Sequence, residues 1–353
     1  MNVGLRYRLI LWTLFFVSTC TLPSFAHPPI FHTGDGEADE YPMRLRQIGP
    51  RKRRSADPLT VRLEKHVRVL AQMKRGWNDP GLEAAAQYIE ANFKTRGLVP
   101  RAQVFSARNR TFRNIIVELG PVDRSTIVIG AHYDSYGSLP GADDNASGVA
   151  ALIELSAMLQ SRKNSLKYRY VLAAWPLEEP PFFATPQMGS YVHAAALKKA
   201  KENIRLMISL EMLGYYSDTP KSQSFPIAAM ANLYPTTGNF ITLVGRPGEA
   251  QDIAQLKASF RRAKLIPTEA VIAPPQVKGI DFSDHRNFWS HGYRALMITD
   301  TSFYRNHNYH EKSDTPDRLD YKRMSAVVKS LDMALAELKP RPKASAQPAV
   351  RAP

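Results

Sequence analysis

The sequence predicts an α/β protein, a three-layer sandwich whose central, mostly parallel (mixed) twisted sheet has helices on both faces. Apolar strand-like runs alternate with amphipathic helical segments through most of the chain, as this architecture requires. The run 126–131, Thr-Ile-Val-Ile-Gly-Ala, is apolar throughout, which is typical of a strand that is covered on both faces. Polar side chains follow several of these runs, and open α/β sheets place their sites at the carboxyl ends of strands.

Two amphipathic helices open the predicted domain. Apolar side chains recur at helical spacing over 58–73, and a second such segment begins at Asp79-Pro80 and closes at Gly97. Strands are expected at 104–105, 112–119 and 126–131. A helix over 146–160 then leads to a strand at 168–175, so the strands before and after this helix should be parallel neighbours.

The second half of the chain continues the alternation. We expect helices at 187–200 and 252–263, strands at 206–210, 240–244 and 294–299, and a terminal helix at 318–338. Residues 216–237 are expected to form a loop. The Pro-rich residues 264–284 are expected to line the mouth of a pocket.

The ends of the chain differ in composition from its middle. Residues 1–26 resemble a secretory signal peptide, with Arg6 and Arg8, an apolar run over 9–17, and small residues ending at Ala26. Export to the periplasm or the medium is therefore expected. Residues 27–55 are predicted to be a flexible basic segment, 56–338 one folded catalytic domain, and 339–353 a disordered basic tail.

The single cysteine, Cys20, lies within the predicted signal, so the mature chain has no disulfide. A lipoprotein interpretation of Val-Ser-Thr-Cys is a less favoured alternative, because threonine is a poor residue before a lipidated cysteine. The apolar run is too short to predict a membrane span.

The formal charge of +15 is concentrated at the ends of the chain. Residues 1–55 carry eight basic and four acidic side chains, residues 339–353 carry four basic and none acidic, and residues 56–338 are left with +7. The middle of the chain has no nucleic-acid motif or interleaved aromatic platform, so no nucleic-acid partner is expected. The basic run 51–54 is interpreted as a solvated linker, or less simply as a processing site or a contact for an anionic surface.

Imidazole and carboxylate groups gather after the predicted strands. His132 and Asp134 end the strand at 126–131, and Asp143 and Asp144 precede the next helix. This donor set suits zinc, with Asp134 placed to hold the second ring nitrogen of His132. Ordinary helix capping is the alternative interpretation, although capping needs one carboxylate and not several. Further candidates at the same edge are listed in chain order: Glu178, Glu179, Glu211 and, in a later loop, His310.

Taken together, these residues resemble the motifs of the co-catalytic zinc aminopeptidases, the clan of secreted bacterial leucyl-type aminopeptidases, glutamate carboxypeptidase and glutaminyl cyclase. The resemblance covers roughly residues 60–338, and its specificity comes from motifs that occur in order: His132-Tyr133-Asp134, residues 141–148 (Gly-Ala-Asp-Asp-Asn-Ala-Ser-Gly), Glu178-Glu179, residues 211–214 (Glu-Met-Leu-Gly), residues 283–285 (Ser-Asp-His) and Tyr309-His310. It implies the zinc-peptidase fold.

The resemblance also implies a role for each residue, with two zinc ions per chain. His132 and Glu211 would bind one zinc, Glu179 and His310 the other, and Asp144 would bridge both. Glu178 would act as general base on a metal-bridged water, and Asp134 would hold His132. The implied activity is that of an exopeptidase that acts on peptide substrates with a free N-terminus.

Two departures from the family pattern stand out. The family commonly has Asp where this chain has Glu211, and the extra methylene lengthens the reach to the first zinc. Pro180-Pro181-Phe182-Phe183 replaces a commoner glycine-containing sequence, so Phe182 and Phe183 are candidates for a pocket wall or for loop packing.

Three functions remain open from the sequence. An aminopeptidase is favoured. A glutaminyl cyclase, an acyltransferase with a single zinc, is the alternative. The cyclases depart from the motif Gly-Ala-Asp-Asp-Asn-Ala-Ser-Gly, however, and this motif is intact at residues 141–148. A non-catalytic binding module would require degraded ligand positions, and all five positions carry competent residues. The oligomeric state and the preferred N-terminal residue are not predicted.

Overall fold

The structure is a computed structural model that describes residues 57–340. The helices are α1 (Pro58–Ala71), α2 (Pro80–Thr95), α3 (Gly148–Ser161), α4 (Gly189–Lys199), α5 (Ala250–Ala263), α6 (His285–Ser290) and α7 (Tyr321–Glu337). The strands are β1 (Arg101–Ala107), β2 (Arg110–Leu119), β3 (Thr126–His132), β4 (Arg169–Trp175), β5 (Ile204–Glu211), β6 (Ile241–Gly245), β7 (Thr268–Ile272) and β8 (Ala295–Thr299). The predicted signal (1–26), the predicted flexible segment (27–55) and residues 341–353 of the predicted tail lie outside the described residues.

All eight strands form one mixed sheet in the order β1-β2-β4-β3-β5-β8-β6-β7. The central strands β4, β3, β5 and β8 are parallel to one another. Antiparallel pairing joins β2 to β4 on one side and β6 to β8 on the other. The predicted mostly parallel, mixed sheet is confirmed, and the carboxyl ends of β3, β4, β5 and β8 lie at one edge.

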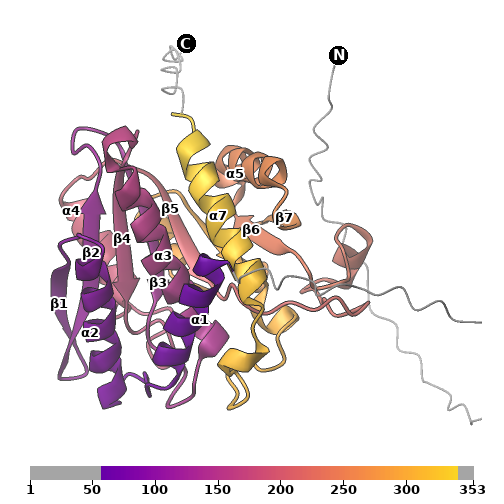
Figure 1. Ribbon diagram of the computed structural model, residues 1–353, viewed down its shortest axis with the longest axis horizontal. Helices are drawn as coiled ribbons and strands as arrows, with labels where there is room; N and C mark the ends of the chain where they lie inside the picture. The colour runs from indigo at the N-terminus through magenta and orange to yellow at the C-terminus, as the bar shows by residue number, and fades with distance from the viewer. Residues whose placement is uncertain (1–56, 341–353) are drawn as a thin grey trace, which may run out of the picture. The chain divides into compact units, whose positions relative to one another are not determined.

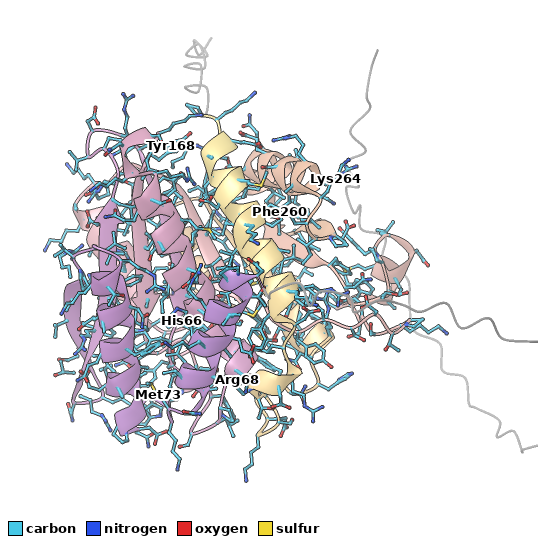
Figure 2. All side chains as sticks on the ribbon, viewed as in Figure 1. His66, Arg68, Met73, Tyr168, Phe260 and Lys264 are labelled. Atoms are coloured by element: carbon cyan, nitrogen blue, oxygen red, sulfur yellow. The ribbon has the colours of Figure 1, made fainter. Side chains whose placement is uncertain are left out.

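Helices cover both faces of the sheet. In Figure 1, α1, α2, α3, α5 and α7 lie on the viewer's side of the sheet, and α1 packs on α3 and α7 while α5 packs on α7. Figure 2 marks His66 on α1 and Phe260 on α5 in this layer. Helices α4 and α6 pack on each other and on the opposite face. The predicted three-layer sandwich is confirmed.

The apolar character of β4 follows from this double coverage. Tyr170 and Leu172 belong to the core beneath α3 and α7, whereas Val171 and Trp175 belong to the core beneath α4 and α6. Successive side chains of a strand point to opposite faces, so a strand between two layers is apolar at every position. A Cβ at Gly130 would overlap the Trp175 ring, and only glycine fits there.

The ends of two helices follow the expected capping chemistry. Asp57 precedes Pro58 at the start of α1, and its carboxylate accepts a hydrogen bond from the Leu59 amide at 3.4 Å. Asp320 begins α7 by accepting bonds from the amides of Lys322 and Arg323 at 3.1 and 3.0 Å.

Two short elements were not predicted. The edge strand β7 (Thr268–Ile272) and the helix α6 (His285–Ser290) lie within or beside the Pro-rich region 264–284, for which no helix or strand was predicted. Both are too short to show a periodic pattern, and four of the five β7 residues are only partly buried. Among residues 57–340, none of the helices has the length and apolar character needed to cross a bilayer.

Candidate active site

The candidate residues come together because four parallel strands end at the same edge of the sheet. His132 is the last residue of β3, and Glu211 is the last residue of β5. Glu178 and Glu179 follow β4, and His310 lies in the loop after β8. All five side chains are at least three-quarters buried. A polar cluster is therefore enclosed at this edge.

His132, Asp144 and Glu211 form a first group of metal-ligand type. The Nε2 atom of His132 lies 3.2 Å from Asp144 Oδ1 and 3.5 Å from Glu211 Oε2. The three candidate ligand atoms lie within 4.8 Å of one another. The longer side chain of Glu211 thus lies beside both His132 and Asp144.

Asp144, Glu179 and His310 form a second group. The Nε2 atom of His310 lies 3.2 Å from Asp144 Oδ2 and 3.1 Å from Glu179 Oε2. Asp144 therefore presents one carboxylate oxygen to each group. This is the geometry of a bridging ligand between two neighbouring cations.

The structure distinguishes Asp144 from Asp143, which spacing alone left undecided. The Asp143 carboxylate points away from both groups and accepts hydrogen bonds from the Gly214 amide at 2.8 Å and from the Asn306 side chain at 2.9 Å. Asp143 holds the surrounding loops together and is not in contact with His132 or His310.

The residues present fit a divalent metal such as zinc. Several buried polar atoms in the two groups lie near charged neighbours but make no well-formed hydrogen bond: both ring nitrogens of His132, Oε1 of Glu179 and Nε2 of His310. Such orphaned atoms are costly in a protein interior unless a ligand satisfies them. Imidazole and carboxylate are the donors that zinc accepts in catalytic sites.

The electrostatics lead to the same conclusion. Burial and the nearby charge of Asp144 raise the pKa of Glu179 to about 8. Burial lowers the pKa of His310, but the close contacts with the Asp144 and Glu179 carboxylates outweigh it and place that pKa at about 10. Carboxylates packed this closely require compensating positive charge, and a bound divalent cation would supply it.

Asp134 organises the site without joining either group. Its Oδ1 lies 3.4 Å from His132 Nδ1, and its two oxygens accept the backbone amides of Glu178 at 3.2 Å and Glu179 at 3.0 Å. One carboxylate therefore orients the His132 ring and fixes the peptide segment that carries both glutamates.

Glu178 belongs to neither ligand group. Its Oε2 lies 3.9 Å from His132 Nε2, and its side chain opens on the same cavity as Glu179 and Glu211. Burial, offset in part by His132 and reinforced by the charges of Glu211 and Glu179, raises the pKa of Glu178 well above its usual range. A carboxyl group with a raised pKa can both accept and return a proton.

Three supporting residues were not assigned roles from the sequence. The Asp314 carboxylate accepts the amides of Asp143 and Asp144 at 3.0 and 3.1 Å, and Ser283 donates to Glu211 Oε2 at 2.7 Å. Asn145 bonds the Leu210 carbonyl at 2.9 Å. The motif strings contained Asn145 and Ser283 but not Asp314, and no local pattern tells which partner each of the three residues meets across the fold.

A cavity of about 320 Å³ opens beside the two ligand groups. Its wall is formed mainly by apolar side chains from the 223–234 loop, from β6, β7 and β8, and from the 278–282 and 301–304 loops. The prediction that residues 264–284 line a pocket is confirmed. Phe183 is part of the wall, whereas Phe182 is buried in the core, where its ring meets Trp77 at 5.4 Å.

Comparison with known proteins identifies the family. Residues 114–334 match Peptidase family M28, so the chain belongs to that family. An Escherichia coli protein described as "Uncharacterized protein YfbL" is 43% identical over 290 residues, which cover 79% of this chain and 88% of that protein. A "Probable leucine aminopeptidase" of Arthroderma otae is 24% identical over 279 residues, covering 74% of this chain and 67% of that protein.

Solved structures share the fold. LapB from Legionella pneumophila has a TM-score of 0.62 at 20% identity, covering 79% of this chain and 71% of LapB. Bacteroides thetaiotaomicron glutaminyl cyclase bound to N-acetylhistamine has a TM-score of 0.61 at 17% identity, covering 79% of this chain and 98% of the cyclase. The resemblance to the zinc aminopeptidase and glutaminyl cyclase clan is thereby confirmed.

Proposed function

We propose that this member of Peptidase family M28 is a zinc-dependent aminopeptidase that removes the first residue of peptides with a free N-terminus. The observation that carries the proposal is the pair of ligand groups joined through Asp144. His132 and Glu211 would hold one zinc, and Glu179 and His310 the other. When bound, the zinc pair would polarise the scissile carbonyl and lower the pKa of water.

Glu178 is the proposed general base. Its carboxylate would take a proton from the attacking water and return it to the nitrogen of the leaving amine. Asp134 would keep Glu178 in position through its bond to the Glu178 amide. These groups are buried, so water screens their charges less and the electrostatic interactions that favour proton transfer are stronger.

The cavity favours an apolar first residue. Its wall includes Phe225, Met230, Phe240, Ile280 and Phe303. Each buried methylene of a substrate side chain contributes about 0.8 kcal/mol, so leucyl and phenylalanyl substrates should exceed the alanyl substrate in kcat/KM by at least about tenfold. A glycyl substrate should be poorer still.

A glutaminyl cyclase is the alternative proposal. The solved structures with similar folds include cyclases, and a cyclase would need only one zinc. The complete first group, with Glu211 held by Ser283, argues for the peptidase because it adds a metal site to the one that Asp144, Glu179 and His310 would form. All five ligand positions are occupied by competent residues, which argues against a non-catalytic binding module.

Export is part of the proposal. The basic residues Arg6 and Arg8, followed by the apolar run and small residues up to Ala26, support secretion to the periplasm or the medium. Cell fractionation with an antibody should find a mature protein that begins after residue 26. A cytoplasmic, full-length protein would contradict export without affecting the proposed chemistry.

The test of the activity is a panel of aminoacyl chromogenic substrates, assayed with zinc and after chelation. We expect hydrolysis that disappears with the chelator and returns with zinc, and that follows the apolar preference. A peptide that begins with glutamine should lose its first residue as free glutamine. Release of ammonia with retention of the residue would identify a cyclase instead.

A further inference from the structure

The ring of His310 lies between two tyrosine rings. Tyr136 stacks on one face with ring centroids 4.1 Å apart and an interplanar angle of 6°. Tyr309 stacks on the other face at 3.8 Å and 19°. Both faces of the imidazole are thus covered, while its Nε2 atom points at Asp144 and Glu179.

The two histidines of the site are oriented by different means. The Nδ1 atom of His132 faces the Asp134 carboxylate, which is the usual support for a histidine that binds metal. Among residues 57–340, no hydrogen-bond partner holds the Nδ1 atom of His310. Its ring plane is fixed by stacking instead, since two nearly parallel neighbours permit little rotation about the bond to the ring.

Tyr136 is well placed for this role because its own backbone is held firmly. The Ser135 amide donates to the Arg75 carbonyl at 3.2 Å, and the Leu139 amide donates to the Tyr136 carbonyl at 3.3 Å. The buried Arg75 guanidinium also bonds the Pro140 carbonyl at 2.9 Å. The loop after β3 therefore presents the Tyr136 ring from a fixed base.

Little else in the structure accounts for Tyr136. Its side chain is 41% exposed, and among the described residues its hydroxyl makes no hydrogen bond. Tyr309 differs, since it also lines the cavity. The Tyr136 ring is half exposed and belongs to no core cluster. Its stacking on His310, a candidate metal ligand, is therefore the contact that accounts for its position.

We propose that Tyr136 is a positioning residue of the second metal site and that its ring, stacked on His310, replaces the missing hydrogen bond to His310 Nδ1. The proposal rests on the function proposed above, because it takes His310 as a zinc ligand. The ring and not the hydroxyl is the active part, so phenylalanine should serve in its place.

The experiment is a competition between the protein and a chromophoric chelator for zinc, carried out on the full chain. Tyr136→Ala should lose one of the two zinc ions at a chelator concentration about tenfold lower than wild type, the low end for removing support from a metal ligand. Tyr136→Phe should match wild type. Tyr191→Ala is the matched control, because Tyr191 packs edge-on against His291, a partly buried histidine outside both ligand groups, so this variant should leave both zinc ions unchanged.

A double-mutant comparison separates positioning from a general structural effect. If Tyr136 acts through His310, then Tyr136→Ala should weaken zinc binding no further in a His310→Ala background. Wild-type affinity in Tyr136→Ala, an equal loss in Tyr136→Phe, or an additive loss in the double variant would each overturn the proposal. Wild-type protein that binds fewer than two zinc ions would instead overturn the dinuclear site on which the proposal rests.

Discussion

At the scale of single residues, the general-base role of Glu178 is the part of the proposed chemistry that one substitution tests most sharply. Glu178→Gln keeps the shape of the side chain but removes its ability to accept a proton. We expect kcat to fall by at least about 10²-fold, with bound zinc per chain unchanged because Glu178 belongs to neither ligand group. Steady-state kinetics and metal analysis check this. Near-wild-type turnover, or loss of zinc, would assign the base to another residue.

Glu211 tests whether the first ligand group binds metal. Glu211→Ala should lower the zinc content from about two to about one per chain and abolish most activity, because Asp144, Glu179 and His310 still form the second group. Glu211→Asp shortens the arm by one methylene but keeps a carboxylate near Ser283, so it should retain more zinc and more activity than the alanine variant. Equal zinc content in wild type and Glu211→Ala would show that Glu211 is not a zinc ligand.

The sequence predicted which side chains meet at the sheet edge, but not how each is held. His132, Glu179 and Glu211 were found because strand ends are visible in an apolar pattern. The choice of Asp144 over Asp143 came only from the resemblance. Its physical reason is that Gly214 and Asn306 bind Asp143, and these partners lie 71 and 163 residues away in the chain. Local spacing does not encode such contacts.

At the scale of elements, Glu154 joins the helices α1, α2 and α3 on one face of the sheet. From α3, its carboxylate meets Arg62 at 2.7 Å and His66 at 3.1 Å, both on α1, and Arg96 at 2.5 Å directly after α2. Figure 2 shows His66 in this helical layer. The Glu154 side chain has no exposed surface and the Arg96 side chain is mostly buried, so removing the charge of Glu154 leaves the Arg96 guanidinium without its buried partner.

We therefore expect Glu154→Gln to reduce the free energy of unfolding at pH 7 by about 3 kcal/mol. Burial raises the pKa of Glu154, but the bonds from His66, Arg62 and Arg96 outweigh it and lower that pKa from 4.5 to about 2. A lowered folded-state pKa contributes stability above pH 4.5 that is lost as the pH falls toward 2, so the difference between variant and wild type should shrink over that range.

Urea unfolding at several pH values measures this difference. Glu64→Gln is the control, because Glu64 forms an exposed pair with Arg68 on the same helix and should cost less than about 1 kcal/mol. Equal losses in the two variants, or a Glu154→Gln loss that does not change with pH, would contradict the role of Glu154.

Most elements were predicted because their apolar pattern is long enough to reveal a period. The strand β4, for example, was expected at 168–175 and occupies Arg169–Trp175. The edge strand β7 was missed, since its five residues pair with β6 alone and only Thr268 is buried. Its formation depends on β6 already being in place, which is a tertiary effect that local propensity does not report.

At the scale of the whole molecule, residues 57–340 should fold and act without the rest of the chain. Both ends of this range make contacts with the folded domain that the shortened chain must keep. Asp57 caps α1 and bonds Ser325 and Lys329 at 2.6 Å each, and the Lys339 amide donates to Gln255 at 3.1 Å. A chain limited to 57–340 should keep its melting temperature and its hydrolysis of small substrates. A drop of several degrees would show that the removed segments contribute to the fold.

The account as a whole depends on two zinc ions acting together at the edge of the sheet. Its most direct test is to remove all metal from the protein, add zinc in measured steps, and record bound zinc and hydrolysis of a leucyl substrate on the same sample. We expect binding to saturate at about two zinc ions per chain and full hydrolysis to require the second. Saturation at one zinc ion, with cyclisation of an N-terminal glutamine peptide and no release of leucine, would contradict the account.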